Sequence, residues 1–198
     1  AVLGVNDGLV SNFSLVMGVA GGTDSGDIVL LAGVAGLLAG AFSMAAGEYI
    51  SVRSQRDVYE HQLRIEAAEL EEWPEEERDE LALIYQAKGL TPEEARRVAD
   101  RIMAQPDVAL DTMAREVLGL VPGSLGSPWG AAISSFLAFV TGAVVPVVPY
   151  MVGSGSMALG LSAGLSALAL AAVGGAVAAS SGRNTAWGSL RMLLAGGL

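Results

Sequence analysis

The sequence predicts an all-α, polytopic membrane protein with five transmembrane helices and a helical, water-soluble insert. Its 198 residues are 52% hydrophobic and have a mean hydropathy of +0.50, which is more apolar than most soluble domains. Apolar runs of about 20 residues recur along it, and that is the length that crosses a bilayer. Most of the charged side chains lie in one segment: residues 57–116 carry 17 acidic and 7 basic side chains, and the rest of the chain carries 4 of each.

This distribution predicts three segments. Residues 1–54 should contain two transmembrane helices, over 2–20 and 28–52. Residues 55–120 should form the acidic insert, and residues 121–198 should contain transmembrane helices three to five. Both ends of the chain fall inside apolar runs, as expected for a piece of a longer protein, and no basic segment of a cleavable signal peptide precedes the first run.

The insert should be helical, with its helices separated at prolines. No turn signal occurs between Ile50 and Glu72, so the second transmembrane helix should continue into the insert. Trp73 should end it, because the residue before a proline is disfavoured in the helical region, and Pro74 suits the first turn of the next helix. Three helices should follow: one ending at Lys88-Gly89, one over about 92–105 behind a capping box at Thr91 and Glu94, and one over about 107–118.

The last three transmembrane helices have weaker boundaries. The third should begin at Pro128, and Pro146 and Pro149 should kink it. Residues 157–180 should form the fourth, and the fifth should begin near Thr185.

The basic residues set the orientation. The loops at 21–27 and 153–156 contain no Lys or Arg, whereas residues 53–115 contain nine of the 11. Basic loops stay in the cytoplasm, so the insert should face the cytoplasm, in the plasma (inner) membrane if the chain is bacterial. The chain has no Cys, which excludes thiolate metal sites and disulfides. The acidic excess argues against nucleic acid as a partner.

Two carboxylates interrupt the apolar runs. A charge within the bilayer is costly, so residues such as Asp7 and Glu48 usually face the interior of a bundle and mark an ion path. Met44 and Glu48 are four residues apart and share one helix face. Gly36 and Gly40 continue this stripe, and small residues at that spacing let helices approach closely. We therefore predict a polar transport path lined by Asp7, Met44 and Glu48.

The insert contains a second candidate site, built from glutamates three residues apart. These are Glu66 with Glu69, and Glu77 with Glu80. The two pairs flank the break at Trp73, so a helical hairpin would bring four carboxylates together, and these would repel one another unless cations lay between them. Oxygen ligands suit Mg²⁺, Ca²⁺, Mn²⁺ and Fe²⁺. The last helix of the insert offers Met113 and Glu116, whose thioether would favour transition metals.

A structural explanation competes with each assignment. A glutamate pair on an acidic helix can be a solvated face, and Met113 can be a core residue. His61, the only histidine, can be a surface residue rather than a ligand. Glu48 can snorkel to the cytoplasmic interface or pair with Arg53.

Two other classes of function compete with transport. A di-iron oxidase of the ferritin-like kind needs Glu-x-x-His motifs, and His61 directly follows Glu60 and belongs to no such motif. An enzyme is therefore not expected. A membrane-anchored metal sensor or scaffold would bind ions in the insert without flux. The intramembrane Asp7 argues against it, because a scaffold has no use for that cost.

Three stretches resemble the vacuolar iron transporter family: GVNDGLVS at 4–11, FSMAAGEY at 42–49 and GAVVP at 142–146. The acidic insert resembles that family's cytoplasmic metal-binding domain. The resemblance implies a homodimer of five-span subunits, with the ion path at the dimer interface. It also implies proton-coupled export of Fe²⁺ from the cytoplasm, with Mn²⁺, Zn²⁺, Co²⁺ and Ni²⁺ as further candidate ions.

The resemblance also implies roles for individual residues. Asp7 and Met44 match the family's intramembrane transport residues, and Glu48 lies in the same motif. The four paired glutamates and Met113 match ligands of the metal-binding domain. One position departs from the pattern, because Val117 stands where the family commonly has a glutamate before Leu-Gly, and Glu116 lies one residue earlier.

Overall fold

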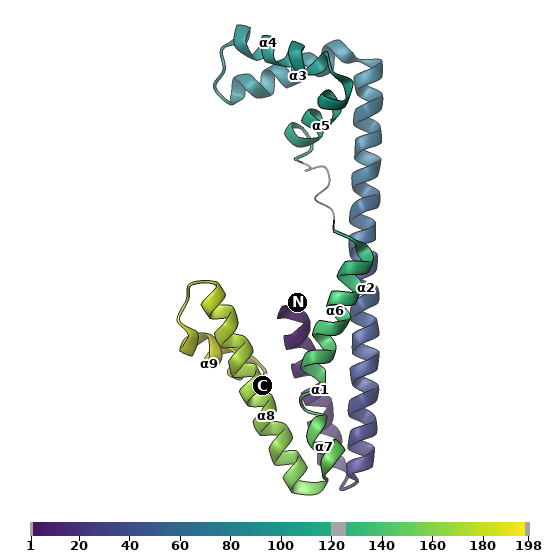
Figure 1. Cartoon of the computed structure of the whole chain (residues 1–198), viewed down its shortest axis with the longest axis vertical. Helices are drawn as coiled ribbons and strands as arrows, with labels where there is room; N and C mark the ends of the chain where they lie inside the picture. The colour runs from purple at the N-terminus through teal and green to yellow at the C-terminus, as the bar shows by residue number, and fades with distance from the viewer. Residues whose placement is uncertain (1, 120–125, 197–198) are drawn as a thin grey trace. The chain divides into compact units, whose positions relative to one another are not determined.

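The computed structural model of this chain describes residues 2–119 and 126–196, and within them every regular element is a helix (Figure 1). The prediction of an all-α protein is confirmed for these residues. The helices are α1 (Val2–Gly22), α2 (Gly26–Glu72), α3 (Pro74–Ala87), α4 (Pro92–Met103), α5 (Pro106–Glu116), α6 (Pro128–Ala143), α7 (Val148–Val152), α8 (Gly155–Ser180) and α9 (Thr185–Gly196).

The contacts divide the chain into two compact units. The first combines the residues up to Ile50 with those from Pro128 onward, and the second is Ser51–Ser127. The continuous helix α2 contributes its first half to one unit and its second half to the other. The sequence placed the corresponding boundaries at residues 54 and 120, and the role of the second unit as a cytoplasmic metal-binding domain stays a prediction.

The prediction of five membrane-spanning helices is not confirmed. Among the described residues, three helices are long and apolar enough to cross a bilayer, namely α1, α2 and α8. The third predicted span is divided, because α6 has 16 residues and ends at Ala143, and the five-residue α7 follows it. The described part of the fifth span is the 12-residue α9. Periodicity and hydropathy located all of these apolar runs, but not the division within the third.

Pro146 explains the division between α6 and α7. Proline has no N–H and clashes with the carbonyl four residues earlier, so it ends regular helical bonding. The N–H groups of Val145 and Val147 accordingly bond over three residues, to Gly142 O at 3.2 Å and Val144 O at 3.0 Å. The kink predicted at this proline is therefore a full interruption of the helix. Two side chains from other helices bond the carbonyls of this interruption: Asn12 of α1 bonds Ala143, and Ser162 of α8 bonds Pro146, each at 2.7 Å.

Helices α1 and α6 make one of the two most extensive contacts in the first unit (Figure 1). Their backbones touch directly at two glycines. A Cβ atom at Gly8 would collide with the carbonyl of Phe139, and one at Gly142 would collide with the carbonyl of Val5. Only glycine permits this approach. Helices pack this closely in membranes because van der Waals contact, rather than water exclusion, holds them together.

Replacing Gly142 with alanine should therefore destabilise the first unit. The added methyl group meets rigid backbone atoms of α1, so the two helices must move apart, and overpacking of this kind typically costs about 1–3 kcal/mol. Thermal unfolding in detergent measures the effect. Gly18→Ala is the matched control, because a Cβ atom at that exposed position of α1 would meet nothing within 4 Å. Equal melting temperatures for the two variants would contradict the packing argument.

The second unit contains the end of α2 with α3, α4 and α5. The predicted break is confirmed: α2 ends at Glu72, Trp73 occupies the N-cap position of the next helix without a side-chain capping bond, and α3 begins with Pro74. The capping box at Thr91 is also confirmed, since its hydroxyl accepts from the backbone of Glu94 and the Glu94 carboxylate accepts from the backbone N–H of Thr91 at 3.0 Å. Leu81, Ala82, Ala95, Ala99 and Met113 form the hydrophobic core of this unit.

Candidate functional site

A cleft of about 370 Å³ lies between α1, α2 and α6 in the first unit. Its lining is Asp7, Ser11, Asn12 and Leu15 from α1, Gly36, Gly40, Ser43 and Met44 from α2, and Phe139 from α6. The cleft therefore brings together one carboxylate, one thioether, an amide and two hydroxyl groups on helices that are otherwise apolar. A transition-metal ion can take oxygen and sulfur ligands of these kinds.

Helical spacing explains how these side chains reach one cleft. Asp7, Ser11 and Leu15 are four residues apart on α1, and Gly36, Gly40 and Met44 are four apart on α2, so each set lies on one face of its helix.

The glycines of α2 make room for groups from the facing helices. A Cβ atom at Gly40 would collide with the ring of Phe139, and one at Gly36 would lie 2.7 Å from Asn12 Oδ1. Met44 Sδ would lie 3.5 Å from a Cβ atom at Gly4. At this stripe α2 meets side chains of α1 and α6 rather than their backbones, so the close approach of two helices at Gly36 and Gly40 stays a prediction.

Asp7 and Glu48 occupy different environments. Asp7 is exposed in the single chain and lines the cleft with Met44. Glu48 is half-buried, lies one turn beyond Met44 on α2, and is not among the residues that line the cleft. Arg53, the alternative partner proposed for Glu48, forms an ion pair with Asp57 at 3.1 Å.

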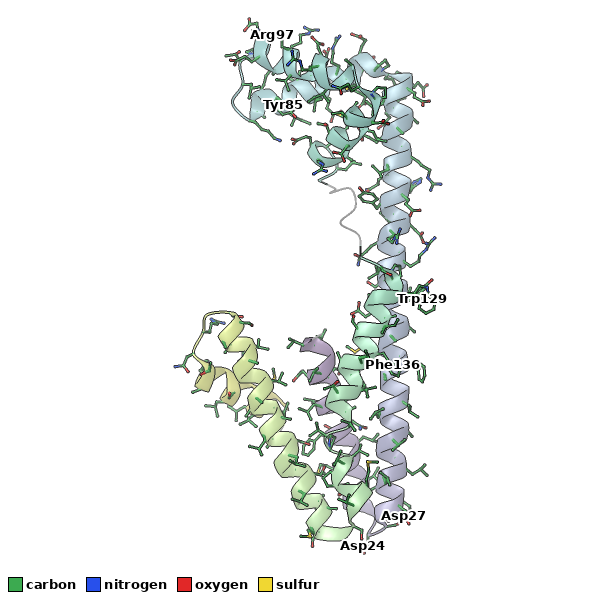
Figure 2. All side chains as sticks on the ribbon, viewed as in Figure 1. Asp24, Asp27, Tyr85, Arg97, Trp129 and Phe136 are labelled. Carbon is green, nitrogen blue, oxygen red and sulfur yellow. The ribbon has the colours of Figure 1, made fainter. Side chains whose placement is uncertain are left out.

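Two pairs of aromatic rings join α2 to α6 outside the lining of the cleft. Phe42 stacks edge-on against Phe136, with ring centroids 5.2 Å apart, and Tyr49 lies against Trp129 at 5.0 Å. Figure 2 shows Trp129 and Phe136 along α6, and it shows Asp24 and Asp27 at the turn that joins α1 to α2. Neither carboxylate is among the residues that line the cleft, so both serve as reference positions for Asp7.

The second unit contains a group of interacting glutamates. Glu66 on α2 is 3% exposed and Glu77 on α3 is 8% exposed. Burial, helped by the charges of Glu77, Glu69 and Glu80, raises the pKa of Glu66 to about 7. Burial and the charges of Glu80 and Glu69 also raise the pKa of Glu77. The two predicted pairs therefore lie close enough across the Trp73 break to disfavour one another's ionisation.

A cation would relieve this repulsion. Glu66 Oε1 is buried and has no hydrogen-bond partner, and an unpaired buried carboxylate is costly unless it is protonated or bound to a positive charge. Within residues 2–119 and 126–196, no three His, Asp or Glu side chains are already grouped as a preformed metal site. Binding by these glutamates would therefore need their side chains to rotate inward.

The other residues assigned to the insert have partners of their own. Met113 is fully buried among the apolar side chains of the second unit's core. Glu116 forms an ion pair with Lys88. His61 is exposed, in keeping with the surface interpretation. The metal-ligand role of Met113 and Glu116 stays a prediction, and the geometry accounts for both residues without a metal.

Comparisons with known proteins found relatives that match the whole chain or most of it. The VIT family matches residues 1–198. The chain belongs to the VIT family. It is 39% identical over 202 residues to the vacuolar iron transporter of Acanthamoeba castellanii, with all of this chain and 72% of that protein covered. It is 36% identical over 150 residues to vacuolar iron transporter 1 of Arabidopsis thaliana, with 76% of this chain and 60% of that protein covered. The vacuolar iron transporter of Centaurea cyanus is 31% identical over 198 residues, with 100% and 81% covered.

Two polar residues of the cleft in this VIT-family chain, Ser11 and Asn12, were not predicted from the sequence. Ser11 donates its hydroxyl to the carbonyl of Asp7 at 2.5 Å, and Asn12 is buried against α6. Both follow Asp7 within an otherwise apolar run. The sequence feature that could have identified Asn12 is an amide side chain within an apolar run, because its polar atoms need partners inside a membrane.

Proposed function

We propose that this chain carries divalent metal ions across a membrane, with Fe²⁺ as the principal substrate. The observation that supports the proposal most directly is the cleft that Asp7 and Met44 share between helices of membrane-spanning length. A carboxylate supplies charge and a thioether supplies a softer ligand, which together suit Fe²⁺ better than Mg²⁺ or Ca²⁺. The relatives named vacuolar iron transporters agree with this substrate.

The proposed direction is export from the cytoplasm in exchange for protons. The acidic second unit would collect the ion on the cytoplasmic side, and Asp7 and Met44 would pass it across the bilayer. A carboxylate that releases a metal ion can take up a proton, so Asp7 is also the proposed proton carrier. A second subunit would cover the exposed Asp7 and complete the path, and Mn²⁺, Zn²⁺, Co²⁺ and Ni²⁺ are candidate secondary substrates.

The test is metal flux into proteoliposomes under an imposed pH gradient. Fe²⁺ entry that depends on the protein and is accompanied by an opposite movement of protons, followed with a trapped pH dye, is the expected result. Metal binding by the protein in detergent without flux into vesicles would instead support a sensor or scaffold. Consumption of oxygen on addition of Fe²⁺ would favour an oxidase.

Replacing Met44 with leucine should change the metal preference. The two side chains have similar volumes, so the packing against α1 should survive, but the sulfur ligand is lost. We expect Fe²⁺ and Co²⁺ flux to fall about tenfold and Mn²⁺ flux, which depends more on oxygen ligands, to fall much less. Competition between the ions in proteoliposomes measures this. Parallel losses for all three ions would mean that the sulfur of Met44 is not a ligand.

A further inference from the structure

Asn12 is a buried residue whose amide makes a hydrogen bond through only one of its two polar atoms. It is 2% exposed, and its Nδ2 donates to the carbonyl of Ala143 at 2.7 Å. That carbonyl is available because the break at Pro146 diverts the N–H of Val147 to Val144 O. The other amide atom, Oδ1, is buried and has no partner.

The orientation of this amide is fixed by chemistry. Ala143 O is an acceptor, so the atom that faces it must be the donor Nδ2, and Oδ1 must face the other way. Oδ1 is directed at Gly36, where an added Cβ atom would lie 2.7 Å from it. Asn12 and Gly36 both line the cleft that holds Asp7 and Met44. An electron-rich oxygen is therefore fixed in the cleft wall beside Gly36, where the end of the Leu15 side chain also lies, with its Cδ2 closer than Oδ1 to the same Cβ position.

We propose that Asn12 Oδ1 is an additional cation contact in this cleft, beyond the site formed by Asp7 and Met44. The inference rests on the proposed transport function. Side-chain amide oxygens are ordinary ligands for divalent cations. Asn12 is five residues after Asp7 on α1, which is about 7.5 Å along the helix axis, and with the predicted orientation it lies on the far side of Asp7 from the cytoplasm. A neutral oxygen binds a cation less tightly than a carboxylate, so it can accept the ion and still release it.

A purely structural role for Asn12 is the competing explanation, and the chain contains a matched control for it. Ser162 of α8 is also fully buried, and it donates to the carbonyl of Pro146 at 2.7 Å, at the same break. It is not among the residues lining the cleft. If Asn12 only holds the break, then removing either hydrogen bond should have the same kind of effect.

The experiment compares Asn12→Leu with Ser162→Ala by Fe²⁺ flux in proteoliposomes and by thermal unfolding. Both variants should melt at lower temperature. Only Asn12→Leu should raise the KM for Fe²⁺, by about fivefold or more. Asn12→Asp keeps an oxygen at this position but loses the donor, so its KM should stay within about twofold of wild type or fall, while its maximal rate decreases because a charged group retains the ion.

Gly36→Ala provides a second route that removes neither partner of the hydrogen bond between Asn12 and Ala143. Its methyl group would displace the end of the Leu15 side chain, whose Cδ2 is the nearest atom to that position, and would lie against Oδ1. It should therefore also raise the KM, whereas Gly18→Ala, in open space on α1, should not. If the wild type transports metal and both Asn12→Leu and Gly36→Ala keep its KM, this inference is overturned and the proposed transport function is not. Absence of flux in wild-type vesicles would overturn the proposed function and this inference with it.

Discussion

Replacing Asp7 with asparagine should reduce Fe²⁺ flux in proteoliposomes about a hundredfold. Asparagine has nearly the same shape as aspartate, so the substitution removes the negative charge while preserving the packing of α1. A hundredfold loss corresponds to about 3 kcal/mol, since each tenfold change is about 1.4 kcal/mol. This is a reasonable cost for leaving a divalent cation without its only carboxylate in the cleft described here. Proton movement should be lost together with metal movement, because the same carboxylate would carry both.

Asp24 provides the matched control for Asp7. It is an exposed aspartate in the loop between α1 and α2, outside the cleft, and Figure 2 shows it at that turn. Asp24→Asn removes the same charge and should leave flux within about twofold of wild type. Flux through Asp7→Asn within threefold of wild type would remove Asp7 from the transport path. Loss of flux in both variants would indicate a general effect of charge rather than a specific site.

Local signals predicted a large part of this structure. The break at Trp73, the capping box at Thr91 and the continuation of α2 past Ile50 all depend on a few neighbouring residues, and the structure contains all three. The placement of Asp7 and Met44 in one cleft was also predictable, because an intramembrane charge is costly unless it faces other helices and because Met44 shares one helix face with the glycines of α2.

Features that depend on distant contacts could not be predicted. Pro146 predicts a disturbance of the helix, but the hydrogen bonds that Asn12 and Ser162 donate to the carbonyls of the break come from residues remote in sequence and could not be predicted. The core position of Met113 and the ion pair of Glu116 with Lys88 likewise depend on how α3 and α5 pack. Sequence spacing puts two residues on one face of a helix, but it does not say what that face meets.

The stability of the second unit should decrease as the pH rises from about 4.5 to about 7. Burial, with Glu77 and the other neighbouring carboxylates, raises the pKa of Glu66 to about 7 from its ordinary value of 4.5. A carboxyl group with a raised pKa in the folded state favours folding while it is protonated. Its contribution is therefore fully present below pH 4.5 and is lost as the pH rises through 7. The upper limit of this loss is about 3 kcal/mol, at about 1.4 kcal/mol per pKa unit.

Glu66→Gln should remove most of this dependence, because glutamine occupies the same space and stays neutral. Its melting temperature in detergent at pH 7.5 should exceed that of the wild type by several degrees, and the two proteins should converge near pH 4.5. Glu60→Gln, at an exposed position on the same helix, should follow the wild-type curve. A wild-type melting temperature that stays constant or rises between pH 4.5 and 7 would contradict the argument.

Metal binding should reverse the order of the melting temperatures of wild type and Glu66→Gln at pH 7.5. Mn²⁺ serves as an air-stable divalent probe, and a ligand that binds only the folded state at a hundred times its Kd stabilises that state by about 2.7 kcal/mol. Saturating Mn²⁺ at pH 7.5 should therefore raise the melting temperature of the wild type above that of Glu66→Gln, which lacks the charged oxygen. At pH 5 the ion should have little effect on either protein, because a protonated Glu66 must lose its proton before it can bind metal. Equal stabilisation of both proteins by Mn²⁺ at pH 7.5 would show that Glu66 is not a ligand, and that its burial serves the packing of α2 against α3 alone.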